Sequence, residues 1–274
     1  MRLAPPFPTL SEIMHLIGQT GQRLAEIEAS EGAAGNISVY LGWDVSPEPF
    51  FPVNEPFTLP TAAPELAGHA FLVTGSGRRL REIAHSPEAN LAFIRVDEGG
   101  LTGRMYTSLD RLFQKPTSEF NSHLAVHRDQ IAHNNLNFHA IIHAQPLHLV
   151  YLSHIARYQD THYLSRHVLR WQPESIVNMP EGIGFLPFML PGSQELMVAN
   201  IKSMREHSIV LWAKHGVMVR SDSSVKKACD LIEYAETGSH YEYLNLSNHG
   251  LADGLSIPEI RSICDHFHVV QHIF

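Results

Sequence analysis

The chain has 274 residues, of which 44% are hydrophobic and 18% are charged, an ordinary balance for a globular protein with a sizeable core. Its net charge of −8 and its lack of a long Lys/Arg run exclude a nucleic-acid-binding surface as its main feature. The two cysteines, Cys229 and Cys264, exclude a disulfide scaffold and favour a reducing compartment.

The proline-rich first eight residues lack the apolar segment of a secretory signal. No apolar run approaches the roughly 20 residues that a membrane span needs. We therefore expect a cytoplasmic protein that binds neither membranes nor nucleic acids. The 19 histidines nearly equal the 20 Lys and Arg in number, so their positions must decide which of them bind a metal.

In the first part of the chain, Thr9-Leu-Ser-Glu12 forms a capping box and predicts a helix that ends near residue 30. Alternating apolar residues over 37–41 predict a half-buried strand. The proline-rich stretch 43–64 has no period and predicts a long surface excursion. A short apolar strand over 70–74 then ends in Gly75-Ser-Gly77.

Further along, we expect a strand over 91–96 and a helix that begins near Pro116-Thr-Ser-Glu119. His123, Leu124, Val126, His127 and Ile131 recur along that helix at mixed helical spacing. The remaining elements expected are strands at 138–143, 175–179, 208–213 and 217–219, and helices from Pro146, after Gly192, from Ser224 and from Ser256. Strands and helices mix without strict alternation, which predicts one α/β domain over residues 1–274 with a mixed or antiparallel central sheet.

His143-Ala-Gln145 ends one of these strands. Residues i and i+2 of a strand lie on one face, about 7 Å apart, so the two side chains can hold a metal between them. An amide oxygen is a poorer ligand than an imidazole, which makes this pattern weaker than two histidines. A structural histidine that bonds to the backbone is the alternative.

Lys214-His215-Gly216 interrupts two apolar strands. Glycine lets the backbone turn sharply and directs the His215 imidazole toward a cleft. Alone, His215 is also compatible with a structural role. Together with His143 from a neighbouring strand end, it forms half of a metal site.

Two segments suit a phosphate group. Gly75-Ser-Gly77 permits a nest of backbone N–H groups, and Arg78 and Arg79 follow it. Pro116-Thr-Ser-Glu119 places two hydroxyls and a carboxylate at an expected helix N-terminus. A tight turn and an ordinary N-cap are the alternatives.

In combination, two histidines, a carboxylate and two such loops suit carbanion chemistry beside the carbonyl of a phosphorylated sugar. The metal would act as a Lewis acid, and Glu119 would move the proton.

The chain resembles the class II aldolase/adducin family, and most closely its rhamnulose-1-phosphate aldolase branch. The resemblance covers roughly residues 10–245, and its segments occur in the family's order. The matching segments are Gly35-Asn36-Ile-Ser, Phe71-Leu-Val-Thr-Gly-Ser-Gly77, Ala89-Asn90-Leu with Arg95-Val-Asp97, Pro116-Thr-Ser-Glu119, Ile142-His143, Pro180-Glu-Gly-Ile-Gly184 with Leu186-Pro187, Pro191-Gly192, Ser208-Ile-Val-Leu-Trp212 and His215-Gly216-Val217.

The resemblance implies a three-layer fold and a divalent metal, typically zinc, bound by His143 and His215. It implies that Glu119 is the catalytic carboxylate and a possible fourth ligand, and that Glu174 is a second acid delivered across a subunit boundary. Positions around the phosphate and substrate match Asn36, Ser76, Gly77, Thr117 and Ser118. The family's tetramers imply a homotetramer with active sites between subunits.

Two residues depart from the family pattern. Gln145 stands where the family has a third metal histidine, and Ala33 stands where it has an asparagine. Gln145 can still bind through its oxygen, and His148 is an alternative ligand. These departures predict weaker metal binding or a harder metal, and a different substrate.

Three functions therefore compete. The first is reversible retro-aldol cleavage of a ketose 1-phosphate to dihydroxyacetone phosphate and an aldehyde. The second is an aldolase or epimerase that acts on a related sugar. The third is a non-catalytic adducin-like module, which Gln145 and Ala33 favour and which His143, His215, Glu119 and Glu174 disfavour.

Overall fold

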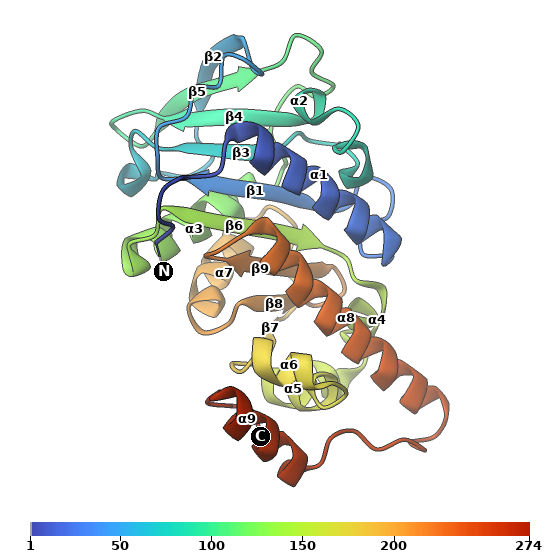
Figure 1. The fold of residues 1–274 in the computed structure, drawn as a ribbon. Coiled ribbons are helices and arrows are strands. Elements are labelled where there is room, and N and C mark those ends of the chain that lie inside the picture. The colour runs from blue at the N-terminus through green and yellow to red at the C-terminus, as the bar shows by residue number, and fades with distance from the viewer. Residues whose placement is uncertain (1) are drawn as a thin grey trace.

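The computed structural model describes residues 2–274, which fold around one nine-stranded sheet (Figure 1). The strand order is β2-β5-β4-β3-β1-β6-β9-β8-β7. Neighbouring strands are antiparallel except β7 and β8, which are parallel, so the predicted mixed sheet is confirmed. The strands are β1 Asn36–Leu41, β2 Val53–Thr58, β3 Ala70–Thr74, β4 Leu91–Val96, β5 Thr102–Thr107, β6 Phe138–Ala144, β7 Gly184–Leu186, β8 Ile209–Trp212 and β9 Gly216–Ser221.

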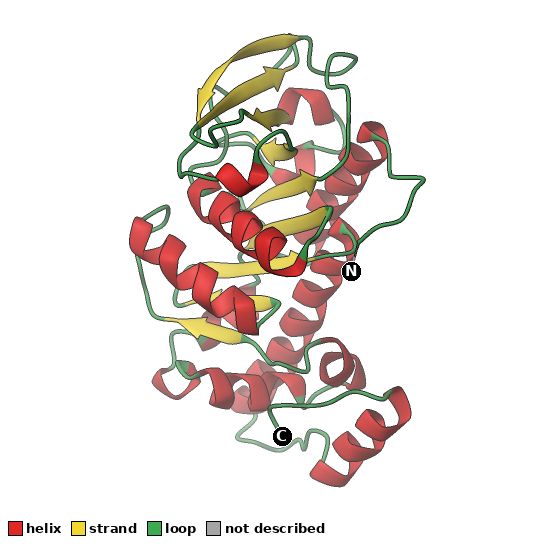
Figure 2. Ribbon diagram, turned by 90° about the vertical axis from the view of Figure 1, so that its left-hand side faces the viewer, coloured by secondary structure: helices red, strands yellow, loops and turns green. Residues whose placement is uncertain are grey.

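Helices cover both faces of this sheet. The α-helices are α1 Leu10–Glu26, α2 Pro87–Asn90, α3 Phe120–Asn134, α4 Leu147–Leu152, α5 Thr161–Leu169, α6 Pro173–Asn178, α7 Gln194–Glu206, α8 Val225–Ser247 and α9 Ile257–Phe267. Helices α1 and α8 pack together on one face, and α3 and α7 pack together on the other (Figures 1 and 2). Helices α5, α6 and α9 lie beyond the β7 edge of the sheet. The predicted three-layer α/β architecture is thus confirmed.

Both predicted capping boxes are present. The Thr9 hydroxyl accepts a hydrogen bond from the Glu12 N–H, and the Glu12 carboxylate accepts one from the Thr9 N–H. Ser256 and Glu259 make the equivalent pair at the start of α9. No helix in the described part of the chain is long and apolar enough to cross a membrane.

Three local predictions were wrong. The stretch 43–64 contains the edge strand β2, which the pattern missed because Pro56 is tolerated only at a sheet edge. Residues 173–178 form helix α6 rather than a strand, because Pro173 suits the first turn of a helix. Strand β1 is buried along its whole length rather than half-buried, because helices cover both of its faces.

Burial of β1 leaves a polar seam between the sheet and α3. The seam consists of Ser38 from β1, His139 from β6, and His123 and His127 from α3, and none of the four is exposed to solvent. Ser38 Oγ is 2.7 Å from Nδ1 of His123 and 2.8 Å from Nε2 of His127. Nδ1 of His127 is 2.7 Å from Nδ1 of His139. The apolar core is thereby interrupted by one continuous hydrogen-bonded chain.

Burial lowers the pKa of all three histidines. The pKa of His123 falls to about 3, and those of His127 and His139 lie well below the ordinary value. The main cause is desolvation, because a buried imidazolium loses its hydration; nearby positive charges lower the pKa of His127 and His139 further, whereas Glu119 partly offsets the effect of burial on the pKa of His123. The folded protein therefore holds three neutral imidazoles.

This burial predicts a loss of stability in mild acid. Unfolded histidines take up protons below pH 6.5 while the folded ones do not, so stability is complete above that pH and is lost as the pH falls. Below pH 6.5, each histidine lowers the free energy of unfolding by about 1.4 kcal/mol per pH unit. The three together lower it by about 4 kcal/mol per pH unit. Urea unfolding of chelator-treated protein at pH 7.5, 6.0 and 5.0 measures the slope. The His127→Gln variant lacks one of the three imidazoles and should show a shallower slope; equal slopes would contradict the prediction.

Candidate metal centre

His143 lies at the end of β6, beside the start of β9. Its Nδ1 is 2.9 Å from the Val217 carbonyl oxygen, which can only accept, so Nδ1 carries the proton. Its ring stacks on Trp212 with ring centroids 4.7 Å apart. These two contacts fix the tautomer and the ring orientation, and they leave the lone pair of Nε2 free to bind a metal.

His215 comes from the tight turn between β8 and β9. Lys214 adopts a left-handed conformation with φ of 62°, and the His215 N–H closes the turn on the Trp212 carbonyl. Gly216 then passes so close to β6 that a Cβ there would lie 2.4 Å from the Ala144 carbonyl oxygen and 2.7 Å from Cε1 of His143. The absence of a side chain at Gly216 thus allows the two imidazoles to approach, with ring centroids 4.9 Å apart.

Glu119 reaches both imidazoles from the N-cap position of α3. Its Oε2 lies 3.5 Å from Nε2 of His143, and its Oε1 lies 3.6 Å from Nε2 of His215. The Asn36 amide donates to Oε2 at 2.8 Å and holds the carboxylate in place. Among the described residues, Glu119, His143 and His215 are the only group of three or more His, Cys, Asp or Glu side chains whose potential ligand atoms all lie within 4.8 Å of one another.

The electrostatics of the cluster suit a divalent cation. Burial raises the pKa of Glu119, but the positive charge that His143 and His215 carry when protonated, together with the hydrogen bond from the Asn36 amide, outweighs it and holds the pKa below the ordinary value. Burial and His143 lower the pKa of His215, which keeps that imidazole neutral. Oε1 of Glu119 is buried without a hydrogen-bond partner. A carboxylate with two neutral imidazoles is a donor set that fits zinc and other divalent transition metals.

The two phosphate-capable segments lie side by side next to Glu119. Gly75 pairs with Pro116 in a β-bridge, the Ser76 N–H donates to the Lys115 carbonyl, and the Thr117 N–H donates to the Thr74 carbonyl. Gly77 has φ of 72°, which glycine adopts without strain. The structure therefore brings the predicted phosphate residues together, at the N-terminal end of α3. They are Ser76, Gly77, Thr117 and Ser118, with Asn36 bonded to Glu119 nearby.

Gln145 follows β6, and its Cγ lies near Gly216, 3.1 Å from the place that a Cβ on that glycine would occupy. Its N–H donates to the Ala29 carbonyl. Its side chain lines a pocket of about 650 Å³ together with Ser30, Gly32 and Leu147. The role of Gln145 as a metal ligand stays a prediction.

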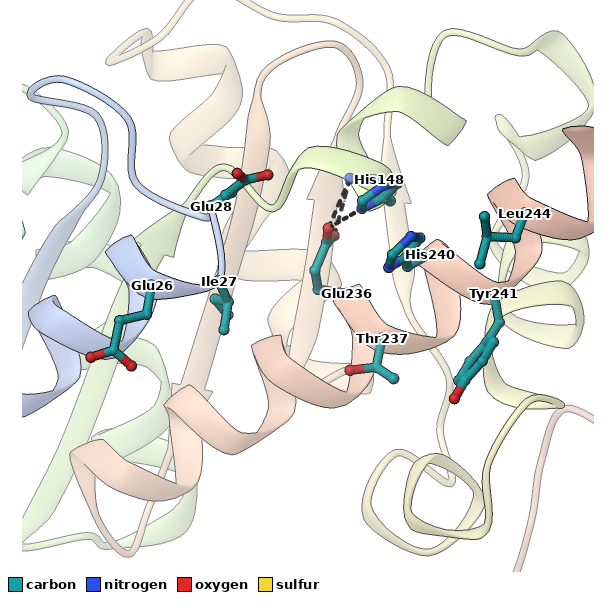
Figure 3. A pocket seen from close by; sticks show the side chains of 9 residues that line it. All are labelled: Glu26, Ile27, Glu28, His148, Glu236, Thr237, His240, Tyr241 and Leu244. Atoms are coloured by element: carbon teal, nitrogen blue, oxygen red, sulfur yellow. Dashed lines mark hydrogen bonds and ion pairs between the residues drawn. The ribbon is translucent and has the colours of Figure 1, made fainter.

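His148 takes part in another arrangement (Figure 3). Its Nδ1 is 2.6 Å from Oε1 of Glu236, and its ring stacks on His240 with centroids 4.0 Å apart. Glu236 also accepts the N–H groups of His148 and Leu149, so it caps the start of α4. His148 is therefore committed to this pocket of about 440 Å³ and does not join the cluster around Glu119.

Glu174 also lies outside the cluster. It is exposed in the first turn of α6. Within one chain it makes no group with the candidate metal-binding residues.

Sequence reasoning overlooked Trp212 and the Val217 carbonyl as groups that orient His143. Nothing in an apolar strand marks a residue that will contact a histidine of another strand.

Comparisons with known proteins show what the chain as a whole is similar to. The family model described as "Class II Aldolase and Adducin N-terminal domain" matches residues 15–243. Rhamnulose-1-phosphate aldolase of Escherichia coli O139:H28 is 31% identical over 220 residues, which are 80% of this chain and 77% of that protein. The sugar-phosphate aldolase of Thermotoga maritima is 29% identical with a TM-score of 0.74, over 87% of this chain and 97% of that one. The L-fuculose-1-phosphate aldolase of Thermus thermophilus, at 18% identity, shares the fold with a TM-score of 0.56 over 88% of this chain and 99% of that one.

The close passage at Gly216 predicts that Gly216→Ala weakens metal binding. The added methyl group pushes against the Ala144 carbonyl and the His143 ring, and displacement of an oriented ligand costs about 10- to 100-fold in metal affinity. Competition titration of Co²⁺ or Zn²⁺ against a chromophoric chelator measures the change. Gly99→Ala is the matched control, because its Cβ meets nothing within 4 Å. Equal affinities of the two variants would contradict this prediction.

Proposed function

The chain belongs to the family of class II aldolases and adducins, and on that premise we propose that it cleaves a ketose 1-phosphate reversibly to dihydroxyacetone phosphate and an aldehyde. The family and its aldolase relatives support a carbon–carbon lyase. The observation that carries the proposal is the convergence of Glu119, His143 and His215 beside the two phosphate-capable segments.

His143 and His215 would hold a divalent metal, which we propose to be zinc, together with Glu119 and the oxygen of Gln145. When bound, this metal supplies Lewis-acid polarisation of the ketose carbonyl and the neighbouring hydroxyl. The hydrogen bond from His143 to the Val217 carbonyl keeps its imidazole in the tautomer that binds metal.

Glu119 moves the proton at the reacting carbon. Its lowered pKa keeps it ionised at neutral pH, and the Asn36 amide holds Oε2 while Oε1 has no partner within the protein. In the aldol direction, an ionised carboxylate held in this way is positioned to remove the proton from the reacting carbon. In cleavage, the same carboxylate first takes up the hydroxyl proton that is released as the aldehyde carbonyl forms and then gives it to the enediolate carbon.

The phosphate group would be bound by the hydroxyls of the two phosphate-capable segments and by the N–H groups of Gly77 and Ser118, because the N–H groups of Ser76 and Thr117 already donate to carbonyls within the protein. Ser76 and Gly77 follow β3, Thr117 and Ser118 precede α3, and the bridge between Gly75 and Pro116 holds the two segments together. Anchoring of the phosphate at the start of a helix orients the reacting carbons over Glu119.

We propose that Glu174 acts as a second acid in the site of a neighbouring subunit. Its exposure on α6 and its absence from the cluster of its own chain support this role. The enzyme would accordingly work as a homotetramer with active sites at subunit interfaces. We also propose that it acts in the cytoplasm.

A related aldolase or an epimerase with another sugar substrate is the second candidate. Ala33 is exposed in the loop before β1 and offers no polar contact, and Gln145 replaces an imidazole. An adducin-like module without catalysis fits less well, because a buried carboxylate beside two histidines is costly to keep without a function.

The proposed function predicts catalytic turnover of a ketose 1-phosphate. With Zn²⁺, Co²⁺ or Mn²⁺ added, the protein should release dihydroxyacetone phosphate from at least one ketose 1-phosphate in an assay coupled to glycerol-3-phosphate dehydrogenase. Glu119→Gln should lower kcat by about 100-fold or more, because the amide cannot exchange the proton. Glu98→Gln, in the exposed turn between β4 and β5, is the control that keeps activity. Failure to cleave any ketose 1-phosphate would favour the second candidate, and failure to bind any divalent metal would exclude both enzymatic candidates.

A second prediction concerns the ligand at position 145. Gln145→His should raise zinc affinity by about tenfold or more, because imidazole binds zinc better than an amide oxygen. Gln145→Ala should lower it if the oxygen is a ligand. Competition titration with a zinc chelator measures both variants. Unchanged affinity in both would show that position 145 does not reach the metal.

A further inference from the structure

Helix α8 packs against both parts of the chain that the proposed reaction uses (Figure 1). It contacts β6, which carries His143, and β9, which His215 directly precedes, and it also contacts α5 and α6. Glu174 stands exposed in the first turn of α6. Because α6 has only six residues, the place of Glu174 depends on the contacts that hold this helix rather than on burial of its own side chain.

Glu242 of α8 is a buried carboxylate on which three donors converge. Its side chain is 2% exposed. Oε2 accepts from Nη2 of Arg170 and from Nε1 of Trp171, each at 3.0 Å, and Oε1 accepts from the Tyr158 hydroxyl. Burial and the bond to Glu242 raise the pKa of Tyr158, so its hydroxyl keeps the proton that it donates. A carboxylate in such a place is costly to bury, so the folded chain is held to the arrangement that keeps its donors in position.

Two of these donors lie in the short connection between α5 and α6. Arg170 and Trp171 follow α5, and the next residue, Gln172, is the N-cap of α6. The Gln172 amide donates to the Tyr234 carbonyl of α8 at 2.9 Å and to the Ser175 hydroxyl at 3.0 Å. Three consecutive side chains thus bind the connection to α8 immediately before α6 begins, two residues from Glu174.

The segment between α8 and α9 holds the same connection in place. The Leu255 N–H donates to the Arg170 carbonyl at 2.7 Å. A Cβ on Gly254 would lie 2.7 Å from Cγ of Arg170, which shows how closely that backbone passes. The guanidinium carbon of Arg170 lies 4.7 Å from the centroid of the Trp171 ring. The connection is therefore fixed by its backbone as well as by its side chains.

We propose that Glu242, through its bond to Trp171, is a positioning residue that sets the place of Glu174. Neither Glu242 nor Trp171 touches the substrate. A catalytic acid that reaches into a neighbouring subunit must arrive at the right place, and a displacement of about 1 Å can cost about 100-fold in rate. The catalytic consequence of this anchor rests on the proposed function of Glu174. It predicts that loss of the anchor impairs the subunit that supplies Glu174 and spares the subunit that binds the metal.

Two variants weaken the anchor with little change of volume. Trp171→Phe removes the indole N–H and keeps an aromatic ring, and Glu242→Gln removes the charge and keeps an oxygen as acceptor. Trp43→Phe is the matched control, because the Trp43 ring stacks on Phe7 and Phe138 instead. Thermal unfolding and metal titration identify variants that fold and bind metal as the wild type does. Both anchor variants should lower kcat by about tenfold or more at unchanged metal affinity, and the control should not.

A double-substitution series distinguishes positioning of Glu174 from general stabilisation. In a Glu174→Gln background, Trp171→Phe should lower kcat no further, because the residue that it positions is already lost. An equal loss of kcat with and without Glu174 would overturn the proposal.

Mixed oligomers show in which subunit the anchor acts. Co-expression of a Glu119→Gln chain with a Glu174→Gln chain should restore activity, because the first chain supplies Glu174 to the metal centre of the second. Trp171→Phe added to the Glu119→Gln chain should lower the restored activity, and the same change in the Glu174→Gln chain should not. Equal effects in the two chains would overturn the proposal.

Amide hydrogen exchange tests the anchor without substrate. Trp171→Phe and Glu242→Gln should speed exchange over residues 174–179 by about tenfold or more, while exchange over β6 and β9 stays as in the wild type. Unchanged exchange over residues 174–179 in both folded variants would overturn the anchor, whatever the activity. Faster exchange in a protein that cleaves no ketose 1-phosphate, or that regains no activity in mixed oligomers, would support the anchor and reject the proposed function instead.

Discussion

The buried carboxylate of Glu119 is the constraint on which the rest of the site depends. A carboxylate in a closed interior is costly unless positive or hydrogen-bonding groups compensate it. Here the Asn36 amide donates to the carboxylate, the start of α3 lies beside it, and His143 and His215 compensate its charge when they are protonated or share a bound cation with it. Each of these partners belongs to a different part of the chain, so the carboxylate is stabilised only when β1, β6, β9 and α3 are assembled.

Close approach of β6 and β9 is the second requirement. The Gly216 backbone passes against the Ala144 carbonyl and the His143 ring, and Trp212 stacks on that ring. The candidate metal-binding nitrogen of His143 is consequently fixed by packing and by one hydrogen bond to a carbonyl, rather than by a second carboxylate. Such support lets a site with few ligands keep its geometry.

The interior beneath α3 is unusual because it is polar where sheet and helix normally bury apolar side chains. Ser38, His123, His127 and His139 bond to one another, which offsets part of the cost of their burial while they stay neutral, although Nε2 of His123 and Nε2 of His139 have no hydrogen-bond partner. The expected loss of stability in mild acid is a direct consequence of this feature, because the buried imidazoles cannot take up protons in the folded state.

The sequence alone determined the fold class, the capping boxes, most strands and the candidate groups Glu119, His143 and His215, because these depend on local periodicity and on motifs in a fixed order. Pattern reading failed at β2, where Pro56 concealed an edge strand, and at α6, where a short apolar run resembled a strand. Tertiary structure alone decided that His148 binds Glu236, that Trp212 orients His143, and that four buried polar residues form one chain. Those facts depend on contacts between elements far apart in sequence, and no local pattern encodes which side chains will meet across a sheet.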